Sequence, residues 1–475
     1  MKDGRLPLDR EEPSLTRATV IATLSRALDL GEGEPLGHSL RACWIAMQMA
    51  DELALDANTR HHLFYAVLLK DTGCSATAHD MSSWFGTDDR AAKRDMRMVN
   101  WSRWHRAVQF AVRTAARGEA LGRRLRQLAV LGRQGPGAVR ELVRERCTTG
   151  AQLVRRLGWD TLVPDAVLSL DEHWDGSGYP LGLAGSAIPL LARIANVAQQ
   201  AEVAWSRGGA RAARDMVRTR RGTWFDPELA DVFLPLSRRP NFFDELAAVR
   251  EPTDLDLVAP AEPESDALSL EAGLVPMAEV FAEIVDRKSP WTEHHSERTA
   301  LYAGRLAEQM GWDRDAVQET VLAGFYHDLG KLGVSNQILD KPGRLTAEEF
   351  RAVQKHPALT ADILSPLTGV TALSRVAAAA AAHHERLDGS GYHRGIAGRD
   401  IPSMGMVVAV ADVFDALTSE RPYKASMTPD DALGLMTPEA GRQLPGDAVA
   451  ALAELVRSGS VPVARPAKGV AGVLG

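Results

Sequence analysis

Cysteine is scarce in this chain of 475 residues, where only Cys43, Cys74 and Cys147 occur. Their number is odd and their spacing contains no close pair, so we expect neither a disulfide framework nor a cysteine-based zinc site. Aromatic residues are also few, at 6%, and the net charge is -7. That acidic balance argues against a protein whose main task is to coat nucleic acid.

Long apolar segments are missing as well. The N-terminal residues MKDGRLPLDREEPSL lack the apolar core of a signal peptide, and no uninterrupted apolar run is long enough to cross a bilayer. We therefore expect a cytoplasmic protein without a membrane partner. A hydrophobic content of 45% and a charged content of 25% are typical of globular proteins, and the length predicts two or three domains.

Helical periodicity is the pattern that the sequence does contain. Segments such as HSLRACWIAMQMADELAL (residues 38–55) and HHSERTALYAGRLAEQMGW (residues 294–312) place apolar residues at i, i+3, i+4 and i+7. Strand-like alternation is rare. The sequence therefore predicts an all-α protein.

One stretch interrupts this periodicity. Residues 250–273, REPTDLDLVAPAEPESDALSLEAG, are acidic and rich in proline, which is typical of a linker. We predict a first domain over residues 1–249, the linker over 250–273, a second domain over 274–460 and a flexible tail over 461–475.

The two halves repeat each other. HSLRA at His38 matches HSERT at His295, and LLKDTGC around Asp71 matches FYHDLGK around Asp328, both with an offset of 257 residues. DGSGYP from residue 175 matches DGSGYH from residue 388 with an offset of 213. The sequence therefore predicts a duplicated helical domain with an insertion of about 44 residues in the first copy, largely between Ser75 and Arg146.

The insertion mixes arginine with tryptophan, in RAAKRDMRMVNWSRWHRAVQFAVRTAARGEALGRRLRQL. Such a patch could contact nucleic acid, but we favour a solvated amphipathic helical hairpin and expect no nucleic-acid partner. Cys74 could be a reactive thiol near Lys70, and a buried, inert cysteine is the favoured alternative.

The second half concentrates side chains that bind divalent metals. In chain order these are His295, His327, Asp328, His356, His383, His384 and Asp412. Imidazole and carboxylate groups suit iron, manganese, zinc and similar ions. Each residue alone is ordinary, because a single helical histidine is more often a satisfied polar residue than a ligand. Their joint occurrence in one domain favours a metal site.

The order of these motifs resembles the HD-GYP branch of the HD-domain metal-dependent phosphohydrolases. The resemblance covers about Ala278 to Lys424 and includes HDLGK, KPGRLTAEEF, HHERLDGSGY and ADVFDALTSERPYK. It implies two tandem HD-domain-like helical bundles, the first of them a degenerate copy.

The resemblance also implies roles for individual residues. Asp328 would bridge two divalent ions, with iron and manganese as the first candidates. One ion would be completed by His295, His327 and Asp412, and the other would be held by His356, His383 and His384. Lys331 would act with Asp328 in catalysis and offer a positive charge to the phosphate. Substrate-binding residues would be Lys331, Asp388, Gly389, Gly391 and Tyr392.

The implied activity is hydrolysis of cyclic di-GMP by an activated water, giving pGpG, and whether it continues to GMP stays open. Two alternatives stay open: a metal-dependent hydrolase of another nucleotide or phosphate ester, and a non-catalytic nucleotide-binding signalling module. A homodimer is compatible with the sequence, which does not fix the oligomeric state.

Three positions depart from the family pattern. His393 replaces the proline of Gly-Tyr-Pro, and an additional metal ligand there is the weaker alternative. Met406 stands where an arginine is common, and Trp291 stands where some members have a glutamate that binds a third metal. We therefore expect two metal ions and an altered nucleotide site.

The first half departs further. Lys70 replaces the first histidine of the His-Asp pair, and Arg146 aligns with His356. Leu170 and Asp171 align with the pair His383-His384, and Gln199 aligns with Asp412. We expect this half to repel divalent cations and to be non-catalytic, while its DGSGYP loop keeps its fold.

Overall fold

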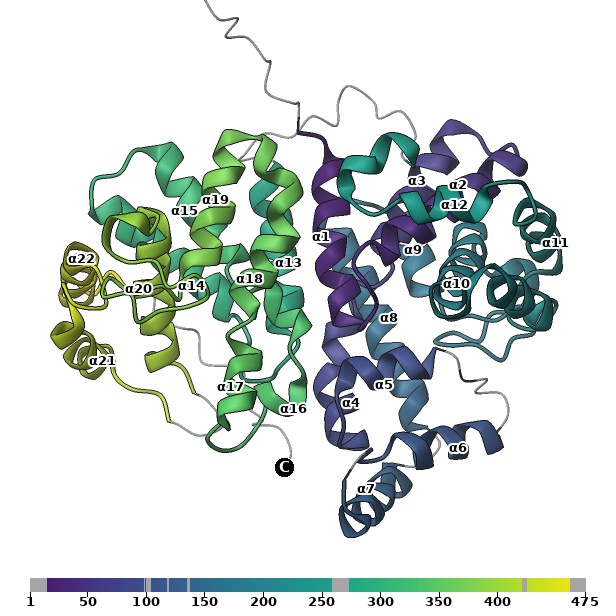
Figure 1. Cartoon of the computed structure of the whole chain (residues 1–475), viewed down its shortest axis with the longest axis horizontal. Coiled ribbons are helices and arrows are strands. Elements are labelled where there is room, and N and C mark those ends of the chain that lie inside the picture. The colour runs from purple at the N-terminus through teal and green to yellow at the C-terminus, as the bar shows by residue number, and fades with distance from the viewer. Residues whose placement is uncertain are drawn as a thin grey trace, which may run out of the picture.

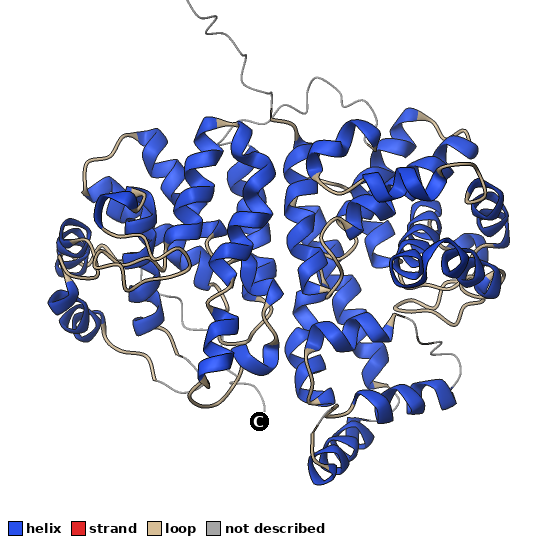
Figure 2. Cartoon of the chain, in the orientation of Figure 1, coloured by secondary structure: helices blue, strands red, loops and turns tan. Residues whose placement is uncertain are grey.

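The computed structural model describes residues 15–97, 99, 104–117, 119–134, 137–258, 273–420 and 425–461, with the side chains of 104–108 left aside. Apart from two isolated bridges, the regular elements of these residues are helices, as Figure 2 shows. The predicted all-α fold class is confirmed.

Among the described residues, twelve α-helices belong to the first half and ten to the second. The first half contains α1 (Arg17–Gly31), α2 (His38–Glu52), α3 (Ala57–Leu68), α4 (Ala78–Phe85), α5 (Asp89–Met96), α6 (Trp104–Thr114), α7 (Leu121–Gln134), α8 (Ala138–Arg156), α9 (Leu162–Leu168), α10 (Leu190–Arg220), α11 (Pro227–Leu236) and α12 (Phe242–Ala248). The second half contains α13 (Val275–Asp286), α14 (His295–Gln309), α15 (Arg314–Tyr326), α16 (Asn336–Leu339), α17 (Ala347–Val353), α18 (His356–Leu364), α19 (Thr371–Ala382), α20 (Ser403–Thr418), α21 (Pro429–Met436) and α22 (Gly446–Arg457). Two 3-10 helices matter below, η3 (Pro252–Leu257) and η6 (Leu329–Gly333).

Helix α1 lies in the centre of the molecule, between the two halves (Figure 1). It packs against α2 and α3 of its own half and against η6 and α18 of the other half. Leu332 of η6 is 1% exposed, and its side chain lies against Gly31. The two halves therefore share a continuous buried apolar core.

The helices that carry the predicted ligands pack tightly against each other. Helix α14 packs against α15 and α20, and α19 packs against α15, α18 and α20. Small residues permit the close approach of α19 and α20, since a Cβ on Gly405 would lie 2.9 Å from the carbonyl oxygen of Ala379 and 3.1 Å from Cβ of Ala382. The alanine run before His383 thus brings two ligand-bearing helices together.

The insertion differs from the predicted hairpin. It forms four helices, α4 to α7, with a small apolar core that includes Phe85 and Phe110, whose ring centroids are 5.4 Å apart. The pattern of charged and apolar residues predicted helices correctly, but it could not show that α5 is buried against the second half. Trp101 and the side chain of Trp104 lie outside the described residues.

The predicted linker is partly ordered. Residues 252–257 form η3, which packs against α1, and Arg26 Nη1 lies 2.7 Å from a carboxylate oxygen of Glu251. Residues 259–272 and the predicted tail from residue 462 lie outside the described residues. Among the helices that are described, none is both long and apolar enough to span a bilayer.

Candidate metal centre

Five helices bring the seven predicted ligands to one place. His295 begins α14, and His356 begins α18. His327 and Asp328 follow the end of α15, and His383 and His384 follow the end of α19. Asp412 lies within α20. Each of the seven side chains is less than one fifth exposed to solvent.

The first group surrounds one oxygen of Asp328. Its Oδ2 lies 3.4 Å from His295 Nε2 and 3.3 Å from His327 Nε2. Asp412 Oδ1 is 3.3 Å from the same His295 nitrogen. One ligand atom each from His295, His327 and Asp412 lies within 4.8 Å of the others.

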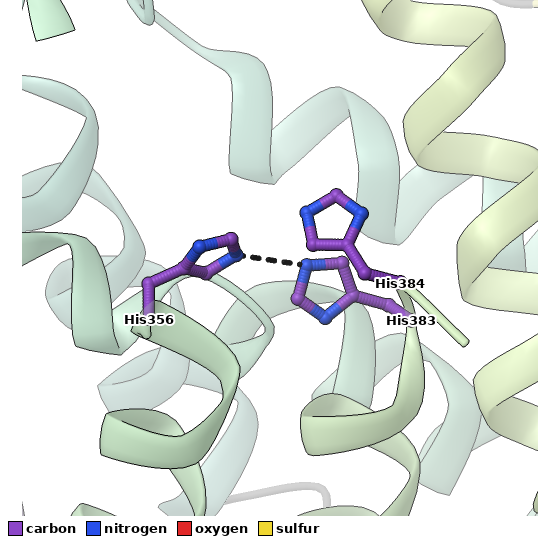
Figure 3. Close-up of side chains that lie close together, drawn as sticks. All are labelled: His356, His383 and His384. Atoms are coloured by element: carbon purple, nitrogen blue, oxygen red, sulfur yellow. Dashed lines mark hydrogen bonds between the residues drawn. The ribbon is translucent and has the colours of Figure 1, made fainter. Parts of the chain in front are cut away.

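The second group faces the other oxygen of Asp328. Its Oδ1 lies 3.3 Å from His356 Nε2 and 3.9 Å from His383 Nε2. Figure 3 shows the rings of His356, His383 and His384 pointing toward one another from two helices. The structure therefore places Asp328 between the two histidine groups.

Hydrogen bonds fix which ring nitrogen of each histidine points inward. Nδ1 of His327, His356 and His383 donates to the backbone carbonyl three residues earlier, at 2.6, 2.7 and 2.6 Å. A carbonyl oxygen can only accept, so Nδ1 carries the proton and Nε2 presents its lone pair to the centre. This is the usual arrangement of metal-binding histidines.

Buried atoms without partners show that the centre fits metal ions. His295 Nε2, His327 Nε2 and Asp328 Oδ1 are buried and make no hydrogen bond, although nearly all buried polar atoms in proteins make one. His356 Nε2 and His383 Nε2 lie 3.2 Å apart. Because both rings carry their proton on Nδ1, these nitrogens face each other as lone pairs, which is favourable only beside a cation.

The protonation states match this arrangement. Burial lowers the pKa of His356 to about 4. Burial, and then the neighbouring imidazoles, also hold the pKa of His383 well below its usual value. Burial opposes ionisation of Asp328, but His327, Lys331 and His295 together lower its pKa. At neutral pH the second group therefore offers neutral imidazoles, and Asp328 is a carboxylate.

Asp415 binds the ring nitrogen of His295 that faces away from the centre. It accepts a hydrogen bond from His295 Nδ1 at 2.7 Å and another from Arg298 Nε at 2.5 Å. Burial would raise the pKa of Asp415, but these two partners lower it to about 2. The motif ADVFDALTSERPYK contains this second aspartate, which the sequence prediction did not single out.

The predicted substrate loop folds back on the His pair. The backbone nitrogen of Tyr392 donates to the carbonyl of His384 at 3.1 Å, and the two rings lie 4.6 Å apart. A Cβ on Gly391 would lie 2.5 Å from the same carbonyl oxygen. Asp388 accepts hydrogen bonds from the backbone nitrogen and hydroxyl of Ser390, while Gly389 has a φ of 76°. These contacts shape the loop, and substrate binding by its residues stays a prediction.

A cleft of about 620 Å³ opens beside Asp328 and Lys331. Lys331 Nζ lies 2.5 Å from Asp328 Oδ2. The cleft wall also contains residues that the sequence prediction missed: Trp291, Lys341, Arg344 and Phe350. The signal for the last three was present in the segment KPGRLTAEEF, which adds two cations and an aromatic residue after Asp328.

The three residues that depart from the family pattern supply no member of the two ligand groups. His393 belongs to neither group, and its Nδ1 is buried without a hydrogen-bond partner. Trp291 lines the cleft. In the first half, Arg193 Nη1 donates to Asp226 at 2.6 Å. Met406, at the matching position, cannot make such a pair.

The first half repeats the framework of the centre. Its loop repeats the hydrogen bond, from the backbone nitrogen of Tyr179 to the carbonyl of Asp171 at 3.1 Å. A Cβ on Gly73 would lie 1.9 Å from the carbonyl oxygen of Arg146, as one on Gly330 would lie 2.0 Å from that of His356. These matching contacts show that Arg146 occupies the position in the first half that His356 occupies in the second half, as the alignment predicts.

Cationic side chains take the place of metal ligands in this half. Lys70 forms an ion pair with Asp71, and Arg146 forms one with Asp171. Arg97 comes from the insertion and donates to Glu32 at 2.5 Å and to Asp71 at 2.8 Å. Glu32, Asp71 and Cys74 lie close enough to hold an ion, but Arg97 already forms ion pairs with both carboxylates.

Cys74 agrees with the expectation of a buried, inert cysteine. It is 3% exposed, and burial raises its pKa well above the usual value. A protonated thiol is a poor nucleophile and a poor metal ligand.

Comparisons with known proteins agree with this duplicated arrangement. The family model described as "HD domain" matches residues 134–229 and 279–446, one stretch in each half. The 3'3'-cGAMP-specific phosphodiesterase 3 of Vibrio cholerae is 40% identical over 420 residues, which cover 88% of this chain and 89% of the relative. The cyclic di-GMP phosphodiesterase of Thermotoga maritima is 43% identical over 151 residues, 32% of this chain and 41% of the relative.

A solved structure is similar over the same extent. The crystal structure of the cyclic GMP-AMP specific phosphodiesterase V-cGAP3 from Vibrio cholerae superposes with a TM-score of 0.64 at 34% identity. The match covers 94% of this chain and 98% of that chain, so both halves take part.

Proposed function

The chain belongs to the HD-domain family and, within it, to the HD-GYP-type phosphodiesterases, and from this premise we propose that its second half hydrolyses a cyclic dinucleotide. The observation that carries the proposal is Asp328, whose two oxygens face separate histidine groups at the end of a basic cleft. The proposal keeps the predicted division into a domain over 1–249, a linker and a domain over 274–460.

Two divalent ions fit the donor atoms of this centre. His295, His327 and Asp412 would hold one, the three histidines His356, His383 and His384 would hold the other, and Asp328 would contact both. When bound, such ions supply positive charge to a phosphate and lower the pKa of water. Iron and manganese are the first candidates, because both ions bind imidazole and carboxylate ligands.

The overall reaction consumes one water. The water oxygen forms a bond to phosphorus, the bond from phosphorus to the 3' oxygen of the sugar breaks, and that oxygen takes a proton. The product is a linear dinucleotide with a 5' phosphate, which is pGpG when the substrate is cyclic di-GMP. A second hydrolysis would give mononucleotides.

The residues of the chain bind and orient this substrate. Lys331 lies at the junction of the cleft and Asp328, where its ammonium can pair with a phosphate oxygen. Lys341 and Arg344 extend the positive charge along the wall. Trp291 and Phe350 offer aromatic faces on which nucleobases can stack.

Two cyclic dinucleotides are candidate substrates. The sequence motifs favour cyclic di-GMP. The Vibrio cholerae relative that shares both halves is named for 3'3'-cGAMP, so we place that substrate beside cyclic di-GMP. The departures at His393 and Met406 lie in and near the loop, where the two substrates would be distinguished.

The experiment is metal analysis followed by turnover. Protein purified without oxygen should contain about two divalent ions per chain. It should convert 3'3'-cGAMP, cyclic di-GMP or both to linear products, as seen by chromatography. Two bound ions with no turnover of either substrate, but hydrolysis of another phosphate ester, would favour the alternative hydrolase.

The degenerate first half motivates the second candidate, a nucleotide-binding signalling module. Calorimetry distinguishes it, because a module would bind cyclic dinucleotide tightly without hydrolysing it in the presence of iron or manganese. Action in the cytoplasm and formation of a homodimer stay predictions.

A further inference from the structure

Helix α5 belongs to the insertion of the first half, yet it begins against the cleft of the second half. Asp89, its first residue, is 0% exposed. Its Oδ2 accepts a hydrogen bond from Lys288 Nζ at 3.0 Å, and its Oδ1 accepts one from the backbone nitrogen of Asn336 at 2.9 Å. The neighbouring Arg90 donates to the carbonyl of Gly333.

The partners of Asp89 belong to two segments that line the cleft. Lys288 lies in the connection from α13 to α14, which continues to Trp291 in the cleft lining. Asn336 begins α16, whose residues Ile338 and Leu339 also line the cleft. The side chain of Asn336 joins the two, since its amide donates to the carbonyl of Lys288 at 2.6 Å.

Lys288 depends on Asp89 for its charge. The lysine is 1% exposed, and a buried ammonium is unfavourable unless it is paired. Burial lowers the pKa of Lys288, and Asp89 opposes that change. Among the described residues of the second half, no carboxylate pairs with the Lys288 ammonium. Its ion pair with Asp89 therefore crosses between the halves.

Other contacts hold the two halves together. Leu332 packs against Gly31 of α1, and Leu30 packs against Gly333. These apolar contacts do not involve Asp89. The buried pair is therefore not required for the halves to stay joined, and its specific effect is on the position of the cleft walls.

We propose that Asp89 is a positioning residue for the cyclic-dinucleotide cleft, so that the non-catalytic half completes the active site of the catalytic half. The inference rests on the proposed function for the identity of the substrate. It assigns a role to the insertion, which has no counterpart in the second half. The carboxylate acts through Lys288 and Asn336 and touches neither substrate nor ligand groups.

The test is Asp89→Asn in the full-length, metal-loaded protein, with Asp88→Asn as the matched control. Asp88 is the N-cap residue of the same helix, and its side chain bonds within the insertion, accepting from the backbone nitrogen of Arg90 at 3.1 Å and from the guanidinium of Arg90 at 2.9 Å. Rates are measured on the cyclic dinucleotide and on bis(p-nitrophenyl) phosphate, a small diester that needs the metal centre but not the cleft walls.

For Asp89→Asn we expect KM for the cyclic dinucleotide to rise at least about tenfold. Metal content and the rate on the small diester should stay within about twofold of the wild type, and Asp88→Asn should leave all three unchanged. A wild-type KM, or equal losses on both substrates, would overturn the proposal, because a purely structural role lowers only the folded fraction.

Asp89→Glu keeps the test decisive if the asparagine variant does not fold. It retains the charge for Lys288 but displaces the carboxylate by one methylene, so KM should again rise while the small-diester rate persists. A wild-type protein that hydrolyses the small diester and no cyclic dinucleotide would overturn both the proposed function and this role. A normal KM in Asp89→Glu would overturn this role alone.

Discussion

Arg97 Nη2 lies 2.8 Å from Asp71 Oδ1, and so a guanidinium pairs with the aspartate that corresponds to Asp328. The same nitrogen lies 2.5 Å from Glu32, and Nη1 lies 3.3 Å from His38 Nε2. The nitrogen of His38 corresponds to the inward-facing nitrogen of His295. The first half has therefore kept the aspartate and the histidine, but the polar atoms of both residues contact the guanidinium of Arg97.

The first prediction compares the two aspartates. Asp328→Asn should lower metal content and reduce kcat/KM on the cyclic dinucleotide by at least about 100-fold, because both ligand groups lose their shared carboxylate. Asp71→Asn should instead cost about 3 kcal/mol of stability, since it leaves the buried Lys70 without its carboxylate and removes one of the two carboxylates that pair with Arg97. Elemental analysis and urea unfolding measure the two effects. Normal metal content in Asp328→Asn would contradict the assigned centre.

The second prediction concerns Asp415, which orients His295. Asp415→Asn should weaken metal affinity about 10- to 100-fold, because the amide no longer fixes the ring and its inward nitrogen. The matched control is Glu202→Gln, since Glu202 holds His38 and Arg41 in the same way in the first half. Titration with a metal-binding dye gives both affinities. Equal losses in the two variants would show that the effect is general destabilisation.

The grouping of the seven candidate ligands could be predicted from the sequence because they lie in ordered local motifs. The offsets of 257 and 213 residues also predicted which residues correspond, and the matching contacts of Gly73 and Gly330 agree. Helical periodicity was sufficient for the fold class. These features depend on short stretches of chain, so one sequence contains them.

Contacts between distant segments left no such pattern. Arg97 and Asp89 lie in the insertion, which has no second copy to compare, and their partners are Asp71 and Lys288. Only the packing of α5 between the halves reveals that one end of the helix meets the degenerate site and the other meets the catalytic cleft. Trp291 likewise joins Lys331 and Phe350 in the cleft only through the fold, because these residues are far apart in the sequence.

The third prediction uses a glycine that touches a ligand helix. Gly330→Ala would place a Cβ 2.0 Å from the carbonyl oxygen of His356, so η6 and α18 must separate. We expect about 3 kcal/mol of lost stability and reduced metal content. Gly73→Ala meets Arg146 in the same way, and should lose similar stability but keep metal content and KM. Gly330→Ala with normal metal content would contradict the contact.

The fourth prediction is the pH dependence of stability in metal-free protein. The pKa of His356 is about 4 in the folded chain because of burial, and about 6.5 in an unfolded chain. Below pH 6.5 the unfolded state takes up a proton that the folded state does not, so stability is present above pH 6.5 and is lost as the pH falls toward 4. Between pH 6.5 and pH 5 this histidine alone should cost about 2 kcal/mol. Urea unfolding after chelation should therefore show that the loss of stability between pH 6.5 and pH 5 is about 2 kcal/mol smaller in His356→Gln than in the wild type. An equal loss in the two proteins would mean that His356 is not held neutral by burial, and the second ligand group would then not be ready to bind a cation at neutral pH.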